Sequence, residues 1–397
     1  MPGGIAEWKE RACAAVDRQR AELIELSSRI HLCPELRFEE HRAAEWLAAY
    51  LQHAGFAVER PVYALATAFA ARLGTGAPQV AILCEYDALP GIGHACGHNI
   101  IAAAGAGAGA AVAGLVRETG GSVVVLGTPA EEGGGGKILM ARKGAFDNVD
   151  AAMMVHPAGV DLTAMQVLAL SQIEVEYRGR AAHASAAPHQ GLNALDALIT
   201  AYNAIAQLRQ HIQATERIHG IITDGGQAPN IVPARAAGTF CVRSATADGL
   251  ARLKQRVVAC FEAGALATGT ELQLRTAGDD YADMLTSQPL AEAYAANSAL
   301  LGRRLSDHEG AYTVAGSTDM GNVSKLVPAI HPMIAAAPPS VPLHSAEFAT
   351  WAGGDRGNGA VIDGAKALAM TALDVLCTPA LLSAMKSAFA AAAERQD

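Results

Sequence analysis

The fold of this chain is decided by residues 83–99, LCEYDALPGIGHACGHN. This stretch begins at the end of an apolar run, residues 79–84, which predicts a buried strand that Pro90 and Gly91 terminate. A helix-like run, residues 100–116, follows it. In an open α/β sheet, the segment between such a strand and such a helix lies in the crevice beyond the strand's carboxyl end, where ligands usually bind.

Two side chains in this stretch, Cys96 and His98, lie two residues apart, and Asp87 lies just upstream. Thiolate and imidazole are the commonest side-chain ligands of transition-metal ions, and Cys-Gly-His can turn both toward one point. A buried thiol beside a hydrogen-bonded histidine is an equally good interpretation, because two ligands do not make a metal site.

The composition describes a core-forming protein with more than one domain. The chain has 397 residues, of which 51% are hydrophobic, so we expect at least two domains. Its net charge of −9 and the lack of a basic stripe argue against a nucleic-acid partner. The most hydrophobic run, residues 100–116, is shorter than a membrane span, and residues 1–20 have no signal-peptide pattern. Seven scattered cysteines form no disulfide framework, so we expect a cytoplasmic protein without a membrane partner.

Strand-like and helix-like runs alternate along most of the chain. Strands are predicted at residues 68–73, 79–84, 122–126 and 151–155. Helices are predicted at residues 6–30, 40–54, 100–116, 290–301 and 360–385. This βαβ rhythm predicts an α/β fold with a mixed, largely parallel sheet flanked by helices.

A different pattern fills the middle of the chain. Three alternating strands are predicted at residues 172–177, 238–242 and 271–276, with helices at 192–211 and 250–267. This order is typical of a small α+β domain whose sheet has one exposed face. Because the larger pattern resumes afterwards, we expect a domain of residues 171–283 inserted in a domain made of residues 1–170 and 284–397.

Two glycine-rich segments imitate nucleotide-binding loops. GAGAG at residues 105–109 suggests a dinucleotide loop, but it lies inside a predicted helix and not between a strand and a helix. GGGGK at residues 133–137 imitates a phosphate loop, but Ile138 stands where a magnesium-binding Ser or Thr is needed. We reject both interpretations and expect the first segment to let its helix pack closely on its neighbours.

More candidate ligands follow other predicted strands. Glu131 and Glu132 come shortly after the strand at residues 122–126, and a nearby cation would relieve the repulsion between adjacent carboxylates. His156 ends the strand at residues 151–155, and His344 lies in a proline-rich loop. Each histidine alone is more often a capping or packing residue. Counted with Cys96 and His98, however, the set exceeds what one tetrahedral ion needs and suits two metal ions a few ångströms apart.

Several segments together resemble a known family. They are DALP at 87–90, CGH at 96–98, PAEEG at 129–133, HP at 156–157, GRAAHAS at 179–185, PNIVP at 229–233, and His344. In this order they resemble the aminoacylase and carboxypeptidase family of di-metal metallopeptidases. More narrowly, they resemble the amidohydrolase branch that contains hippurate hydrolases and plant indole-acetyl-amino-acid hydrolases. The segments EYD at 85–87 and GSTDMG at 316–321, with Asn99 in place of the branch's usual Asp, are similar to the p-aminobenzoyl-glutamate hydrolase and aminoacylase-1-like-2 subgroup.

The resemblance implies a di-zinc peptidase-like fold that binds two divalent metal ions per subunit. Cys96 would bridge the ions, Glu132 and His344 would complete one site, and His98 and His156 would complete the other. The soft ligands favour zinc, manganese is equally expected, and cobalt or nickel could bind according to availability.

The resemblance also assigns catalytic roles. Glu131 would be the general base, and Asp87 would orient or charge-balance a metal ligand. His183, in the inserted domain, would reach the active site of the partner subunit in a homodimer. The inserted domain would thus serve as a lid and as a dimerisation domain.

Four further residues are candidates for binding the substrate. Asn230 in the inserted domain follows from the resemblance, whereas Arg243 and the loop residues Ser317 and Thr318 are weaker candidates for holding a substrate carboxylate. For Arg243, a salt bridge at a strand end is the favoured alternative.

We therefore expect a metal-dependent amidohydrolase that acts on a small-molecule amide. It would cleave N-acyl- or aminoacyl-amino acids, such as p-aminobenzoyl-glutamate-like amides and small dipeptides, with a metal-activated water. A hydrolase of non-peptide amides or carbamates stays open, because the same water activation serves them. A catalytically silent metal-binding homologue also stays open, although Glu131 argues against it.

Overall fold

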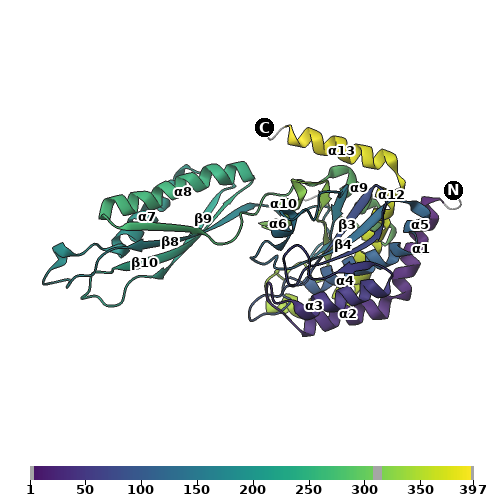
Figure 1. Ribbon diagram of the computed structural model, residues 1–397, viewed down its shortest axis with the longest axis horizontal. Helices are drawn as coiled ribbons and strands as arrows, with labels where there is room; N and C mark the ends of the chain where they lie inside the picture. The colour runs from purple at the N-terminus through teal and green to yellow at the C-terminus, as the bar shows by residue number, and fades with distance from the viewer. Residues whose placement is uncertain (1–3, 307–314, 395–397) are drawn as a thin grey trace. The chain divides into compact units, whose positions relative to one another are not determined.

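The computed structural model describes residues 4–306 and 315–394 of the chain. It divides into two compact units (Figure 1). Unit 1 contains the described residues up to Gln166 and from Met284 onward, and unit 2 contains Val167–Asp283. Unit 2 is therefore inserted into the chain of unit 1.

Unit 1 is built on a six-stranded mixed sheet. Its strands are β1 (Ala57–Glu59), β2 (Phe69–Gly74), β3 (Gln79–Glu85), β4 (Ser122–Thr128), β5 (Ala151–Met153) and β13 (Ala329–Ile330). They lie in the order β1-β2-β4-β3-β5-β13. The pairs β4–β3, β3–β5 and β5–β13 are parallel, whereas β1–β2 and β2–β4 are antiparallel. The predicted mixed, largely parallel α/β fold is confirmed.

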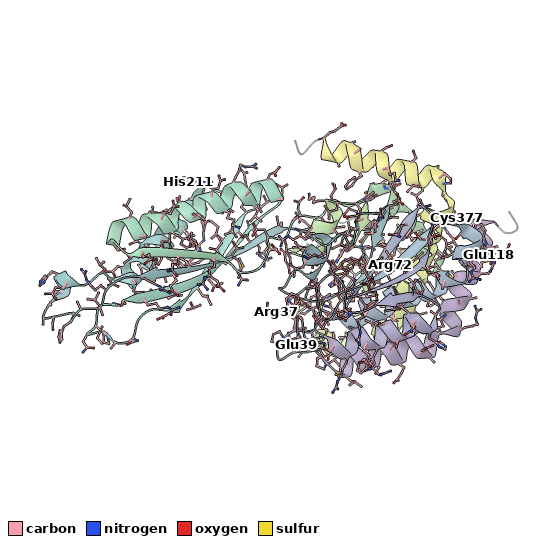
Figure 2. All side chains as sticks on the ribbon, in the orientation of Figure 1. Arg37, Glu39, Arg72, Glu118, His211 and Cys377 are labelled. Atoms are coloured by element: carbon pink, nitrogen blue, oxygen red, sulfur yellow. The ribbon has the colours of Figure 1, made fainter. Side chains whose placement is uncertain are left out.

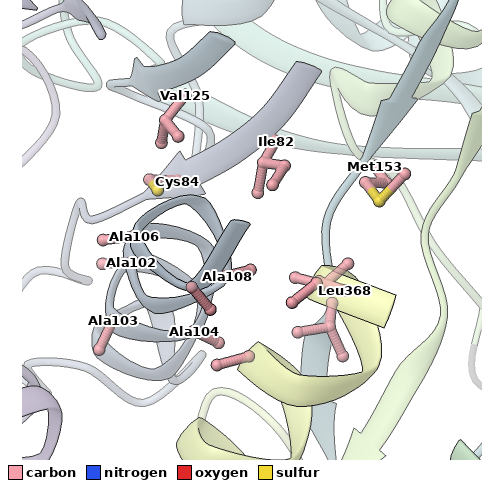
Figure 3. Close-up of a cluster of buried hydrophobic side chains, with 14 of the residues drawn as sticks. Ile82, Cys84, Ala102, Ala103, Ala104, Ala106, Ala108, Val125, Met153 and Leu368 are labelled. Atoms are coloured by element: carbon pink, nitrogen blue, oxygen red, sulfur yellow. The ribbon is translucent and has the colours of Figure 1, made fainter. Parts of the chain in front are cut away.

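Alternate side chains of β3 face two different apolar cores. Ile82 and Cys84 pack on the first core, where Figure 3 shows both next to α4, with Leu368 in the same cluster. Helices that contribute to this core are α1 (Ile5–Arg18), α2 (Arg20–Leu32), α3 (His41–His53), α4 (His98–Ala113), α9 (Gln288–Leu300) and α12 (Asp355–Cys377). Ala81 and Leu83 pack on the second core, with α6 (Gly136–Ala141) and α10 (Met320–Ser324). Because both faces are covered, the central strands β3 and β4 are apolar between their end residues.

Three predicted helices are each broken in the structure. The run 6–30 forms α1 and α2, because the chain turns at Gln19, whose N–H bonds back to Ala15 and Val16. The run 100–116 forms most of α4 and the start of α5 (Val116–Thr119). The run 360–385 forms α12 and α13 (Pro379–Ala393), because Pro379 has no N–H with which to continue the first helix.

Among the described residues, no single helix is both long and apolar enough to cross a membrane. The consecutive helices α12 and α13 satisfy length and composition only as a pair, and they are bent by 93° relative to each other.

Unit 2 is a four-stranded antiparallel sheet with two long helices. The strands are β8 (Ala169–Arg178), β9 (Arg217–Asp224), β10 (Arg235–Ser244) and β11 (Glu271–Thr276), in the order β11-β8-β10-β9. Helices α7 (Ala194–Leu208) and α8 (Ala247–Thr268) pack on one face around Phe240 and Phe261. Strand β9 was missed by the sequence prediction. It is an edge strand whose buried side chain is Ile218, while Ile221 and Ile222 are exposed, so its sequence has no regular polar alternation.

The glycines of α4 bring this helix close to the sheet, as the sequence analysis expected. A Cβ atom at Gly105 would lie 2.7 Å from Cys84 Sγ and 3.0 Å from the backbone oxygen of Leu83. Both atoms belong to β3, which is held between two neighbouring strands and cannot move away. The Ala-Gly composition of α4 therefore sets the distance between the helix and the strand that leads into residues 83–99.

We predict that Gly105→Ala destabilises the protein by about 1–3 kcal/mol, because the added methyl group overpacks the contact with β3. The matched control is Gly359→Ala in α12, where a Cβ atom would meet nothing within 4 Å. There the change should stabilise the protein by up to about 1 kcal/mol, since Ala favours a helix over Gly. Urea unfolding of both variants measures the difference, and equal midpoints would contradict the close packing of α4.

Candidate metal centre

Cys96 and His98 lie at the start of α4, separated by a glycine that the local structure requires. Gly97 has a φ of 77°, and a Cβ atom there would lie 2.5 Å from Pro157 Cγ. A side chain at this position would be strained and would displace the segment that carries His156. The sequence Cys-Gly-His thus allows two candidate ligands to approach a third from another segment.

The first ligand group contains Cys96, His98 and His156, whose ligand atoms lie within 4.8 Å of one another. His156 Nε2 lies 3.4 Å from Cys96 Sγ, while its Nδ1 lies 2.8 Å from the backbone oxygen of Pro157. A carbonyl oxygen only accepts hydrogen bonds, so Nδ1 carries the proton and the Nε2 lone pair faces the thiol. The sequence analysis placed His156 at the end of a strand. In the structure β5 ends earlier, at Met153, and His156 begins β6 (His156–Ala158), which pairs with β14 (Met333–Ala335).

The second ligand group contains Cys96, Glu132 and His344, also within 4.8 Å of one another. His344 Nε2 lies 3.4 Å from Glu132 Oε1. His344 has a φ of 61°, and its backbone N–H donates to the oxygen of Ala95, 3.0 Å away. This uncommon backbone conformation is held by the segment that carries Cys96, so the proline-rich loop is tied to the start of α4. The structure thus brings the five predicted metal ligands together in two groups that share Cys96.

Asp87 connects the two groups. Its Oδ1 lies 3.0 Å from His98 Nδ1, and its Oδ2 accepts a hydrogen bond of 2.9 Å from the backbone N–H of Glu132. Since His98 Nδ1 donates to Asp87, its Nε2 has the lone pair that a metal ion would bind. Asp87 is 1% exposed, so water does not compete for these bonds.

Glu131 and Glu132 are adjacent, but their surroundings shift their pKa values in opposite directions. Burial raises the pKa of Glu131 well above its ordinary value, and the charges of Glu85 and Glu132 raise it further. Burial by itself would also raise the pKa of Glu132, but its contact with His344 and the charge of His98 lower it. When two neighbouring carboxyl groups have pKa values shifted in opposite directions, one of them can transfer protons while the other stays ionised and binds a cation.

The backbone that precedes Glu131 is fixed by a buried acid that the sequence analysis missed. Ala130 has a φ of 60°, and its N–H donates to Glu40 Oε1, 2.9 Å away. Glu40 Oε2 accepts a second bond from Thr67 Oγ1, at 2.8 Å. Burial raises the pKa of Glu40 to about 7. No local sequence signal distinguishes Glu40 from the exposed Glu39 beside it.

A buried triad of charges, Glu85, Lys137 and Asp319, was also missed. Many charged side chains of unit 1 lie at its surface, as Arg37, Glu39 and Glu118 do (Figure 2). In contrast, the side chains of the triad have no exposed surface, and Lys137 Nζ lies 2.5 Å from Glu85 Oε1 and 2.6 Å from Asp319 Oδ1. A lysine within the glycine-rich and apolar run 133–140 was the available signal.

The predicted loop residues Ser317 and Thr318 directly precede this triad's Asp319. Thr318 is buried, and its hydroxyl oxygen accepts a hydrogen bond of 3.2 Å from the backbone N–H of Met320 at the start of α10. Ser317 is half-buried. Their predicted role in binding substrate stays a prediction.

The remaining predicted residues lie in unit 2. His183 and Asn230 are both exposed. Their segments are adjacent, because His183 forms an isolated antiparallel β-bridge with Ile231 and the backbone N–H of Ala184 donates to the backbone oxygen of Asn230. His183 Nδ1 accepts hydrogen bonds from the backbone N–H groups of Ser185 and Ala186, at 3.3 and 3.2 Å. The neutral ring must therefore carry its proton on Nε2, which makes that atom a donor.

Arg243 is half-buried on β10, where its register partners are Leu170 of β8 and Arg217 of β9. Its role also stays a prediction.

Buried polar atoms without hydrogen-bond partners show that the two ligand groups suit divalent cations. His98 Nε2 and Glu132 Oε1 are both buried in this way. Burial, with the charge of Glu132, raises the pKa of the Cys96 thiol well above its ordinary value, so its thiolate needs a cation beside it. Thiolate, imidazole and carboxylate together form a donor set for transition-metal ions.

The chain is similar to known peptidases along nearly its full length. Residues 169–268 match the family model described as a peptidase dimerisation domain. The Xaa-Arg dipeptidase of Mus musculus is 40% identical, over 96% of this chain and 92% of that protein. One of the subunits of the p-aminobenzoyl-glutamate hydrolase of Escherichia coli is 37% identical, over 66% of this chain and 59% of that protein. A dinuclear metal-binding peptidase of the M20 family from Bacillus subtilis has the same fold, with a TM-score of 0.70 and 18% identity over 91% of this chain and 99% of that one. The predicted family resemblance is confirmed.

We predict that Asp87→Asn weakens metal binding about 10- to 100-fold while the protein stays folded. Both partners of Asp87 are N–H donors, so the amide nitrogen of Asn would face one of them and misorient His98 or Glu132. Equilibrium dialysis of the metal-stripped protein measures the affinity. The control is Asp374→Asn, which removes the ion pair between Asp374 of α12 and Lys9 of α1. This variant should bind metal with wild-type affinity. Wild-type affinity in Asp87→Asn would contradict the orienting role.

Proposed function

The chain belongs to the M20 family of metal-dependent peptidases and amidohydrolases, and we propose that it cleaves the amide bond between an aminoacyl or acyl group and a C-terminal amino acid. The observation that carries this proposal is the convergence of Cys96, His98, Glu132, His156 and His344 in two groups beside Glu131. The coarse prediction of a metal-dependent amide hydrolase is confirmed by the relatives. The roles of the individual residues are proposed here.

The two ligand groups would each hold one divalent ion, with Cys96 shared between them. Ions bound there would activate a water molecule for attack on the amide carbonyl. We propose zinc or manganese, because the groups combine a thiolate and imidazoles with a carboxylate, and cobalt or nickel would also suit them.

Glu131 would move the proton. Its carboxyl group is buried, and its Oε2 lies 3.9 Å from His98 Nε2. Burial and the charges of Glu85 and Glu132 raise its pKa above the ordinary value, which makes it a stronger proton acceptor than an exposed glutamate. It would accept a proton from the attacking water and pass that proton to the leaving nitrogen. Asp87 would hold His98 and Glu132 in place during this transfer and would not itself touch the substrate.

Unit 2 would complete the site of a partner subunit. The Nε2–H of His183 is a donor whose tautomer is fixed by two backbone N–H groups, which suits it to stabilise the oxyanion that develops during attack. Asn230, exposed on the adjacent segment, would contact the substrate. The edge strand β9, with Ile221 and Ile222 exposed, offers an apolar surface for a homodimer contact. Closure of this lid over a site would exclude water.

The relatives indicate two substrate classes to test first. The mouse protein is named as a dipeptidase of Xaa-Arg dipeptides, and the Escherichia coli protein as part of a p-aminobenzoyl-glutamate hydrolase. We favour dipeptides, because the mouse protein matches 96% of this chain, whereas the bacterial protein matches 66%. Arg243, Ser317 and Thr318 are the residues we propose to test for binding the substrate carboxylate.

The seven cysteines are all free, which supports a reducing compartment such as the cytoplasm.

We predict that Glu131→Gln lowers kcat for the best substrate by at least about 100-fold, because the proton acceptor is lost, while both metal ions stay bound. The measurement combines elemental analysis with hydrolysis of an Xaa-Arg dipeptide set, p-aminobenzoyl-glutamate and hippurate. The control is Glu39→Gln. Glu39 is exposed and directly precedes the buried Glu40, and this variant should retain wild-type rates. Full activity of Glu131→Gln would exclude it as the base. No turnover of any amide or carbamate by the metal-loaded wild type would instead favour a silent metal-binding homologue.

We predict that two inactive variants restore activity when they share a dimer. His183→Ala and Glu131→Gln should each be nearly inactive alone. In a mixed dimer, one of the two sites would combine Glu131 of one subunit with His183 of the other, so the isolated mixed dimer should recover about one half of wild-type activity. Co-expression with two affinity tags isolates the mixed dimer. If His183 acts in its own subunit, no mixed dimer contains an intact site and activity stays at background.

A further inference from the structure

The loop between α2 and α3, residues 33–40, packs against the turn at residues 130–134, which carries the proposed base. Arg37 Nη1 in this loop donates to the backbone oxygen of Gly133, 3.0 Å away. The last residue of the loop, Glu40, lies at the N-cap position of α3. A polar side chain at this position commonly bonds to the first turn of its own helix. Both carboxylate oxygens of Glu40 bond instead to other segments, and the residue is 0% exposed.

One of these bonds fixes the peptide that leads into Glu131. The N–H of Ala130 donates to Glu40 Oε1, 2.9 Å away, and the oxygen of Ala130 accepts a 3.0 Å bond from the N–H of Gly134. Ala130 has a φ of 60°, a left-handed conformation that a residue with a Cβ atom keeps only where its surroundings hold it. The direction in which the chain enters Glu131 therefore depends on Glu40.

The second oxygen of Glu40 connects this turn to the segment of Asp87. Glu40 Oε2 accepts a 2.8 Å bond from the hydroxyl of Thr67, and the backbone oxygen of Thr67 accepts a 2.6 Å bond from the hydroxyl of Tyr86. Tyr86 directly precedes Asp87 in the chain. Glu40, Thr67 and Tyr86 are all buried, so water does not compete for these bonds. The carboxylate of Glu40 is thus held at both oxygens by fixed parts of unit 1.

We propose that Glu40 is a positioning residue for the reaction, because it holds the Ala130 peptide and thereby sets where the Glu131 carboxylate lies. A general base must lie within hydrogen-bond reach of the proton that it accepts. A displacement of about 1 Å is enough to slow such a step about 100-fold. The inference rests on the proposed function, since it assumes that Glu131 is the base. Glu40 itself would not touch the substrate.

The reach of the Glu40 side chain and its charge can be tested separately. Gln has the same length, and its oxygen can accept from Ala130 while its NH₂ group donates to the hydroxyl oxygen of Thr67. Burial raises the pKa of Glu40 to about 7, so an uncharged side chain suits these surroundings. Asp keeps the charge but is one methylene shorter and cannot hold both bonds. A positioning role therefore ranks Gln above Asp, whereas a role that depends on charge ranks Asp above Gln.

The experiment is steady-state hydrolysis of the best substrate by the metal-loaded, full-length protein. Glu40→Gln should keep kcat within about threefold of wild type, because both hydrogen bonds are replaced. Glu40→Asp should lower kcat and kcat/KM equally, by at least about tenfold, while both metal ions stay bound. The matched control is Glu35→Gln in the same loop. The Glu35 carboxylate accepts bonds from the N–H groups of Arg42 and Ala43, at 2.9 and 3.0 Å, so it supports α3, and this variant should keep wild-type kcat.

A double variant tests whether Glu40 acts through the base. With Glu131→Gln already present, Glu40→Asp should change the residual rate by less than about twofold, because there is no base left to position. An equal loss in both backgrounds would overturn the inference, as would a Glu40→Asp variant that is at least as active as Glu40→Gln.

Another variant keeps the test decisive if Glu40→Asp does not fold. Glu40→Met fills the same space without a hydrogen-bond acceptor and should show the same loss of kcat, whereas wild-type kcat would overturn the inference. If neither variant folds, Glu40 serves the fold itself, which also overturns it. A wild-type rate in Glu131→Gln, or no hydrolysis by the metal-loaded wild type, would instead contradict the proposed function.

Discussion

The candidate site depends on one buried carboxylate, that of Asp87. Its two oxygens hold His98 through the ring and Glu132 through the backbone, so it fixes one ligand of each group. Because Asp87 is shielded from water, these bonds are stronger than they would be at the surface. Any displacement of this carboxylate would therefore move both ligand groups together.

The position of Asp87 follows from the sheet. Strands β3 and β4 are parallel neighbours, and Glu85 lies opposite Thr128 in their register. Their carboxyl ends therefore open at the same edge, which places Asp87 within bonding distance of the segment that carries Glu131 and Glu132. The cost of gathering these acids in a buried place is offset by Lys137 and by the cations that the ligand groups would bind. The fold thus concentrates negative charge where cations are needed.

Unit 2 has its own apolar core and orients His183 through its own backbone. Its sheet and two helices form a core of their own around Phe240 and Phe261, and the exposed His183 lies on a loop tied to the segment of Asn230. The backbone N–H groups of Ser185 and Ala186, which belong to unit 2 itself, fix the tautomer of the neutral His183 ring. A donor that the local backbone already orients loses less freedom when it binds an acceptor.

The sequence by itself determined the class of fold, the family and the residue types of the centre. Apolar runs of strand length identified β3 and β4, and chemically distinctive residues after strand ends or in loops identified the candidate ligands, because those signals are local. What it could not determine are features that depend on contacts between distant segments. Strand β9 is an edge strand without regular alternation, and the pairing of Lys137 with Asp319 spans 182 residues. Only the tertiary structure decides which buried charges meet, because their energy comes from proximity in space and leaves no periodic pattern along the chain.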